Sequence, residues 1–249
     1  MSLAYDDGSH RPKRDRSREG AGKSDRSHIK HDLIRRAVGG QIGAYRLKKT
    51  GRVAIIDGNA GDGLGVNRPQ LDFFSDNMSM TTADVATQVA AKVGNAVVIL
   101  CESDKLRRDA IALRFPDAII LRDNAHAPGS IPSDCEYAVW ISDPCGPAGH
   151  GVDAMQEVAR SIRSDFVVAM NEGAIVRIAG TESDLWKTAR DRYAPMIESP
   201  TWWADELGRR RMSRTPIING AANFKYRVLV VADYLADSAL RRPFEEIKR

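Results

Sequence analysis

The sequence predicts an α/β protein with a doubly wound, mostly parallel sheet. Short apolar runs that end on a polar residue alternate along the chain with segments of helical periodicity, as in βαβ units. The first apolar run, residues 53–56, is followed by Asp57 and the glycine-rich stretch GNAGDGLG. A short uninterrupted apolar run is typical of a strand buried on both faces, in the middle of a parallel sheet.

Composition narrows the class of protein. The chain has 249 residues, of which 43% are hydrophobic, enough for a sizeable core. No stretch is long and apolar enough to span a membrane, and the N-terminus is too polar for a signal peptide. Cys101, Cys135 and Cys145 are too scattered for a disulfide framework or a zinc site. We therefore expect a cytoplasmic protein without a metal and without a membrane partner.

The N-terminal region divides into a tail and the start of a single domain. Residues 1–28 are rich in Arg and Lys and nearly free of apolar side chains, so they are predicted to be disordered, and residues 29–249 form the domain. The basic residues of the tail either contact phosphates or are simply solvated. Apolar residues at helical spacing predict a helix over residues 29–48, which Gly39 and Gly40 are expected to interrupt.

The remaining elements follow in order. Thr81, Thr82 and Asp84 supply N-cap chemistry for a helix that ends at about Val93. The other predicted helices cover residues 103–115, 152–162 and 182–193, and the other predicted strands cover residues 96–101, 118–121, 137–142, 165–171 and 225–235. The last strand is expected to insert antiparallel between two others. Residues 66–80 have no clear period and are interpreted as an inserted loop over the ligand.

Polar residues end the predicted strands, and this regularity predicts a ligand site. Carboxyl ends of parallel strands line one edge, where a ligand can contact several strands. Glu102 ends the second strand, where a carboxylate can accept both hydroxyls of a ribose. A nicotinamide fingerprint G-x-G-x-x-G fails here, since the third glycine position counted from Gly61 falls on Val66. Asp57 at the start of the loop instead suits a cationic ligand.

From about residue 50 to 175 the chain resembles the class I S-adenosylmethionine-dependent methyltransferases. Asp57, Gly61 and Gly63 match the acid and glycines of that family's loop, whereas Gly58 and Asn59 depart from it. The resemblance implies a seven-stranded Rossmann-like methyltransferase fold and S-adenosylmethionine as cofactor. It implies cofactor contacts from nine residues: Asp57, Gly58, Asn59, Gly61, Gly63, Glu102, Ser103, Asp123 and Asn124.

The fourth strand bears on the methyl acceptor. Asp143-Pro144-Cys145-Gly146 is similar to the D-P-P-aromatic motif of methyltransferases that act on the amino groups of adenine or cytosine. The resemblance implies that Asp143 and the carbonyl of Pro144 accept hydrogen bonds from an exocyclic amine and orient it. Two alternatives stay open. Cys145 is either a nucleophile, as in cytosine carbon-5 methyltransferases although their Glu-Asn-Val is not found, or a small buried residue.

The C-terminal region suggests a nucleic acid partner. Trp202 and Trp203 precede a cluster of arginines, a combination that suits base stacking and phosphate pairing, or else core packing beside a solvated face. The cluster consists of Arg209, Arg210, Arg211 and Arg214. We expect DNA or RNA to contact this cluster and the tail.

The chain also resembles, faintly, the three-cysteine-motif partner proteins. Two other classes of function stay open. A non-catalytic binding protein of this fold would show no change in stability with S-adenosylmethionine. A small-molecule methyltransferase would bind the cofactor tightly without salt-sensitive affinity for DNA.

Overall fold

The structure, a computed structural model, describes residues 24–47, 49–60, 81–143, 151–171, 211–214, 218–219 and 225–232. Its helices are α2 (Ser24–Arg46), α3 (Thr82–Val93), α4 (Lys105–Arg114), the 3-10 helix η1 (Asn124–His126), α5 (Ala127–Ser130) and α6 (Val152–Ser161). Its strands are β1 (Arg52–Asp57), β2 (Ala96–Cys101), β3 (Ile119–Leu121), β4 (Cys135–Ser142), β5 (Ser164–Asn171), β6 (Arg211–Arg214), β7 (Ile218–Asn219) and β8 (Lys225–Ala232).

One mixed sheet organises these elements, in the order β3-β2-β1-β4-β5-β8-β6. The first five strands in that order are parallel, and β8 is antiparallel to β5 and β6. The predicted antiparallel insertion of the last strand is therefore confirmed. The described residues form eight strands and not the expected seven, because β7 also pairs with β8, on the edge that β6 uses.

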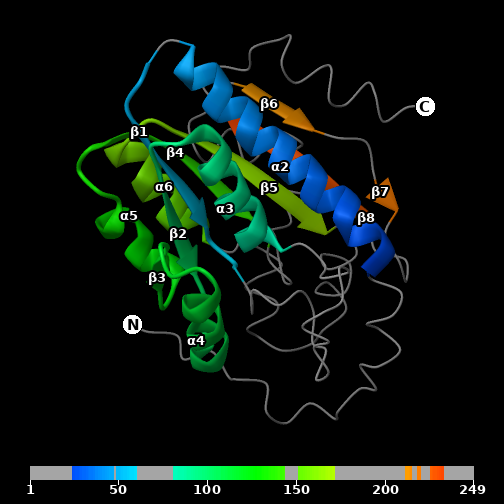
Figure 1. Cartoon of the computed structure of the whole chain (residues 1–249). Helices are drawn as coiled ribbons and strands as arrows, with labels where there is room; N and C mark the ends of the chain where they lie inside the picture. Colours follow the sequence, from blue (N-terminus) through cyan, green and yellow to red (C-terminus); the bar gives the residue numbers. More distant parts are fainter. Residues whose placement is uncertain are drawn as a thin grey trace.

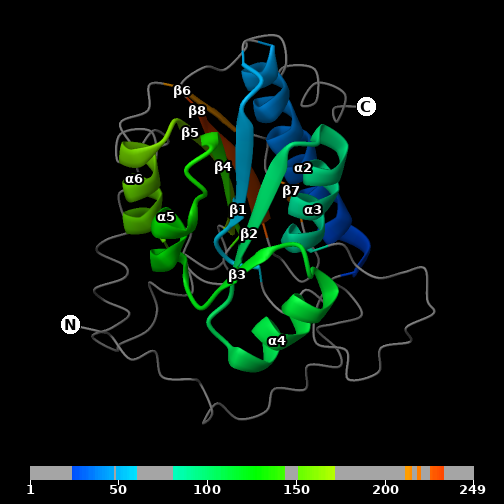
Figure 2. The same ribbon diagram turned by 60° about the vertical axis from the view of Figure 1, so that its left-hand side comes forward.

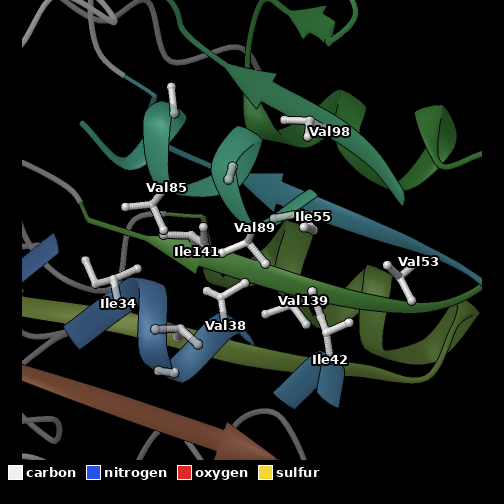
Figure 3. Packing of buried hydrophobic residues seen from close by; sticks show 14 of the residues in the cluster. Ile34, Val38, Ile42, Val53, Ile55, Val85, Val89, Val98, Val139 and Ile141 are labelled. Atoms are coloured by element: carbon white, nitrogen blue, oxygen red, sulfur yellow. The ribbon is translucent and has the colours of Figure 1, made fainter. Parts of the chain in front are cut away.

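Helices cover both faces of the sheet, as Figures 1 and 2 show, so the described part of the chain has three layers. On one face lie α2, α3 and the buried Ile111 of α4, which pack against alternate residues of the strands such as Ile55 and Val139 (Figure 3). On the other face, α5 and α6 pack against the intervening residues, including Ile56 and Trp140. Burial of both faces explains why the parallel strands are near-continuous apolar runs.

The order of the strands places a topological switch point between β1 and β4. From β1 the chain moves outward to β2 and β3, then returns to the other side of β1 for β4 and β5. Asp57, the last residue of β1, pairs in register with Ile141 of β4. In open α/β sheets, ligands bind outside the carboxyl ends of the strands at such a point. A ligand site is therefore expected among the residues that follow β1, β2 and β4.

Two expectations about the N-terminal helix were wrong. Helix α2 begins at Ser24, not at Ile29, and it continues through Gly39 and Gly40 without a break. A glycine inside a helix costs about 1 kcal/mol relative to alanine, which the burial of apolar neighbours such as Val38 offsets here. Packing against the sheet and α3 thus holds a continuous helix that local propensity disfavours.

Other differences arise where local signals are weak. The sequence did not predict η1, α5, β6 or β7, which are all short. Part of the basic cluster, Arg211–Arg214, forms β6, whose pairing partner β8 is distant from it in sequence. Residues 1–23, the proposed inserted loop at 66–80 and the predicted helix at 182–193 lie outside the described residues. Among the described helices, none has the length and apolar character needed to cross a membrane.

Candidate functional site

Asp57 is the most deeply buried acid near the switch point. Its side chain has no exposed surface, and its Oδ1 accepts a hydrogen bond from the backbone N–H of Asn59 at 3.0 Å. Among the described residues, Oδ2 has no hydrogen-bond partner. Burial raises the pKa of Asp57 to about 7, against the effect of hydrogen bonds from the Thr82 side chain and the Asn59 backbone. An ionised carboxylate here requires a further donor or a cation at Oδ2, which these two hydrogen bonds do not supply.

The turn after β1 is fixed to both neighbouring strands. The N–H of Gly58 donates to the carbonyl of Ile141 in β4, and the N–H of Ala60 donates to the carbonyl of Cys101 in β2, both at 3.0 Å. A Cβ atom on Gly58 would lie 2.7 Å from Nε1 of Trp140, so no larger residue fits without movement of the indole. The chain therefore leaves β1 in a closely packed turn that spans the switch point.

Glu102 and Ser103 follow β2, on the side of β1 away from β4. Glu102 is partly exposed, and its Oε1 accepts a hydrogen bond from the N–H of Asp104 at 2.8 Å and one from the Ser103 hydroxyl at 3.5 Å. The negative charge of Glu102 contributes to the raised pKa of Asp57. Because Asp57 pairs in register with Leu100 of β2, Glu102 follows β2 at the same edge of the sheet as Asp57.

Asp123 and Asn124 follow β3 and have local partners. Asp123 is the N-cap of η1: its Oδ1 accepts a hydrogen bond from the N–H of Ala125 at 3.0 Å and lies 2.7 Å from Nδ1 of His126. The amide of Asn124 lies against Gly151, where an added Cβ would be 2.5 Å from Nδ2. Gly151 has a φ of +89°, which favours glycine. These contacts join the segment after β3 to the start of α6.

Asp143 follows β4 and is held by two side chains from α2. Its Oδ2 lies 2.5 Å from Nζ of Lys30 and 3.6 Å from Nε2 of His31, and its side chain is 12% exposed. Burial by itself would raise the pKa of Asp143, but the charge of Lys30 and the interactions with His31 lower it to about 2. Asp143 is therefore ionised throughout the neutral range.

Asp57 and Asp143, at the ends of the paired strands β1 and β4, thus have opposite protonation behaviour. The negative charge of Asp143 raises the pKa of Asp57. Of these two acids, only Asp143 has a cation beside it among the described residues, the ammonium of Lys30. Asp57 consequently holds a proton up to about pH 7, whereas Asp143 does not. Such divergence between neighbouring acids is typical of functional sites.

The structure brings together only part of the predicted site. Asp57, Gly58, Asn59, Glu102 and Asp143 meet at the carboxyl edge of β2, β1 and β4, while Asp123 and Asn124 lie beyond β3. The predicted residues Gly61, Gly63 and Pro144, together with Cys145, lie outside the described residues.

Sequence reasoning missed four residues that the fold adds to this site: Lys30, His31, Thr82 and Trp140. For Lys30 and His31 the available signal was their place one turn before Ile34, at the start of the buried face of α2. That spacing predicts the face of the helix, but it does not predict which strand end lies beneath it.

The described part of the chain contains two cysteines, Cys101 and Cys135, and both are buried. Burial raises the pKa of both Cys101 and Cys135, so neither is a reactive thiolate. No group of three or more His, Cys, Asp or Glu side chains in these segments could hold a metal ion. Within these segments, the groups at the carboxyl edge are carboxylates, the Lys30 ammonium, the His31 imidazole and the hydroxyls of Thr82 and Ser142.

Comparison with known proteins gives a likeness of fold. No protein-family model matches the sequence, and no curated protein matches it significantly. The chain is similar to protein LPL1258 from Legionella pneumophila str. Philadelphia 1, with a TM-score of 0.54 and 13% identity over 92% of each chain. At this identity the likeness concerns the fold alone.

Two further solved structures have lower scores. The plantazolicin methyltransferase BpumL in complex with SAH has a TM-score of 0.46 and 11% identity, over 89% of this chain and 92% of that one. Precorrin-6y C5,15-methyltransferase from Geobacter metallireducens GS-15 has a TM-score of 0.43 and 12% identity, over 79% and 87%. None of these three structures supports the resemblance to three-cysteine-motif partner proteins.

Proposed function

We propose that the protein is an S-adenosylmethionine-dependent methyltransferase. The observation that supports this most is Oδ2 of Asp57, a fully buried carboxylate oxygen at the switch point that has no partner among the described residues. A buried carboxylate oxygen without a partner is costly, and a ligand that brings an ammonium group to it would remove that cost. S-adenosylmethionine carries such a group, and this position matches the acid of the family's loop.

The residues at this edge fit the rest of the cofactor. Glu102 follows the neighbouring strand β2, where its carboxylate can accept hydrogen bonds from ribose hydroxyls. The packing of Gly58 against the Trp140 indole fixes the turn after β1 at the edge of the sheet where the ligand would lie. Asp123 and Asn124, after β3, would meet the adenine. When bound, the cofactor supplies an electrophilic methyl group attached to a sulfonium.

For the methyl acceptor, we propose an amino group of a nucleic acid base. Asp143 follows the strand on the other side of β1 and is ionised, so it can accept a hydrogen bond from an amine without removing its proton. An orienting carboxylate of this kind directs the nitrogen lone pair toward the methyl group. Cys101 and Cys135 are buried thiols, which leaves Cys145 as the covalent alternative.

Replacement of Glu102 by Gln tests the cofactor assignment. Gln retains the acceptor for the N–H of Asp104, but it lacks the charge for the ribose. A lost charge-assisted hydrogen bond is worth about 1.5–3 kcal/mol, so calorimetry should show S-adenosylmethionine bound roughly 10- to 150-fold more weakly. Asp109→Asn, which removes an exposed carboxylate of α4, is the matched control. Equal affinity in wild type and both variants would contradict the assignment.

The basic segments give a separate prediction about nucleic acid. Deletion of residues 1–23 leaves α2 whole, and replacement of Arg209, Arg210 and Arg211 by Gln removes charge from the second segment. If these residues contact phosphates, each change should weaken binding to RNA or DNA. The slope of log K against log salt should fall by about 0.9 for each phosphate that the variant no longer neutralises. Arg52→Gln, at the other end of β1, is the control. An unchanged salt slope in both variants would show that the two basic segments are solvated and do not contact phosphates.

A further inference from the structure

Lys30 belongs to the helix that covers the sheet, yet its side chain reaches the end of β4. Ile34, Val38 and Ile42 form the buried face of α2 (Figure 3). Lys30 lies one turn before Ile34 on that face, level with the carboxyl edge of the sheet, and its Nζ is 2.5 Å from Oδ2 of Asp143. The Lys30 side chain is 12% exposed, so this is not a solvated surface pair.

The pair presents a hydrogen-bond donor beside an acceptor at one edge of the site. Lys30 and His31 both contact Asp143 at Oδ2, so a hydrogen bond from an amine to the other carboxylate oxygen, Oδ1, is compatible with both contacts. An ammonium has three N–H donors, and it can donate to a ring nitrogen while it holds a carboxylate. An acceptor next to a donor is complementary to an amino group next to an unprotonated ring nitrogen.

We propose that Lys30 and Asp143 together recognise the amidine edge of the base, an inference that rests on the proposed methyltransferase function. Asp143 accepts a hydrogen bond from the exocyclic amine, and Lys30 donates one to the adjacent ring nitrogen. Adenine presents this pattern at its 6-amino group and N1, and cytosine presents it at its 4-amino group and N3. Uracil and thymine lack the amine. Lys30 thus selects the acceptor, and Asp143 orients it.

His31 supports this arrangement from the next position of α2. Its side chain is 11% exposed, its Nε2 faces Oδ2 of Asp143, and its Nδ1 is buried without a hydrogen-bond partner among the described residues. The ring therefore shields the Lys30–Asp143 pair from water on one side, which strengthens both hydrogen bonds to a bound base. If Lys30 only neutralised the charge of Asp143, the enzyme would not distinguish a base with an unprotonated ring nitrogen from an analogue without it.

The first stage of the test identifies the product. Total RNA and genomic DNA are incubated with the full chain and S-adenosylmethionine that carries a labelled methyl group, and then digested to nucleosides. The expected product is N6-methyladenosine or N4-methylcytidine from RNA, or the corresponding 2′-deoxynucleoside from DNA. A label on oxygen, on carbon or on no base, with cofactor binding intact in calorimetry, overturns this inference alone. If calorimetry shows no cofactor binding, both this inference and the proposed function fail.

The second stage compares the natural base with an analogue in which CH replaces the ring nitrogen. Oligonucleotides that span the modified position carry adenine or 1-deazaadenine, or cytosine or 3-deazacytosine. For the wild type, kcat/KM on the analogue should fall about 10- to 100-fold, because a charge-assisted hydrogen bond is lost. For Lys30→Met, the natural base and the analogue should differ less than about threefold, as in a double-mutant cycle.

The controls separate recognition from folding. Lys105→Met removes an exposed ammonium of α4 that pairs with Asp109, and it should discriminate between base and analogue as the wild type does. Lys30→Arg keeps the charge and should keep part of the discrimination. Should Lys30→Met fail to fold, the wild-type comparison still decides: equal rates on the natural base and the analogue overturn the role of Lys30.

Discussion

Asp143→Asn is expected to abolish methyl transfer while leaving cofactor affinity within about threefold of the wild type. In the proposed mechanism Asp143 orients the methyl acceptor and not the cofactor, and the removal of a preorganised electrostatic group costs about 10²–10³-fold in kcat. Because Asp143 has a pKa of about 2, its protonation should not reduce activity between pH 4 and 7. Steady-state kinetics and calorimetry on the same preparation check both statements.

Two comparisons make this result interpretable. Asp143→Asn leaves the Lys30 ammonium without its counter-charge, which costs about 3–5 kcal/mol for a buried pair, so denaturation must show that the variant is folded at the assay temperature. The double variant Lys30→Met with Asp143→Asn removes both charges and should be more stable than the single one. Cys145→Ser should be tolerated. If instead Cys145→Ser is inactive and a fluorinated cytosine in DNA traps the wild type, covalent catalysis replaces this mechanism.

Asp57→Asn is expected to stabilise the cofactor-free protein at pH 8 and to weaken cofactor binding. The pKa of Asp57 is raised from 3.8 to about 7 on folding, so the native state holds this proton more tightly than the unfolded chain. Its contribution to stability is therefore complete below about pH 4 and is lost as pH rises through 7. A difference of three pKa units corresponds to about 4 kcal/mol, so we expect Asn to gain about 2–4 kcal/mol at pH 8 and little at pH 4.

Cofactor affinity is expected to have the opposite pH dependence to the stability of the cofactor-free protein. A cationic ligand beside Asp57 lowers its pKa, so binding near pH 7 should release a proton, and affinity should rise as the pH increases from 6 to 8. Asp134→Asn, an exposed acid that pairs with Arg52, is the matched control and should show neither effect. Calorimetry in buffers of different ionisation enthalpy measures the proton. No proton release together with an unchanged affinity of Asp57→Asn would contradict the role of Asp57.

Local patterns predicted the parts of the fold that local physics decides. Apolar runs buried on both faces predicted β1, β2, β4, β5 and β8, and the capping box of Thr81 with Asp84 is present at the start of α3. The same apolar runs predicted where these strands end, and therefore where the polar side chains of the site lie. For these elements, the residues that determine the structure lie within one window of sequence.

Contacts distant in sequence explain what the sequence did not predict. Strand β6 has no apolar pattern, because its pairing with β8 decides its conformation. Helix α2 runs through Gly39 and Gly40 because packing outweighs propensity. Lys30 reaches Asp143 only because α2 crosses the sheet at one angle, and nothing near residue 30 or 143 specifies that angle. The partners that set the charge state of the site were therefore beyond sequence reasoning.

Thermal unfolding of the wild-type protein with S-adenosylmethionine and, separately, with NAD tests the central claim most directly. Both ligands contain adenosine, but only S-adenosylmethionine carries an ammonium group, which the proposal places at the Asp57 carboxylate. At a concentration 100-fold above Kd, a ligand that binds only the native state adds about 2.7 kcal/mol, a shift of several degrees. We predict this shift with S-adenosylmethionine and none with NAD. A shift with NAD alone, or with neither ligand, would contradict the account.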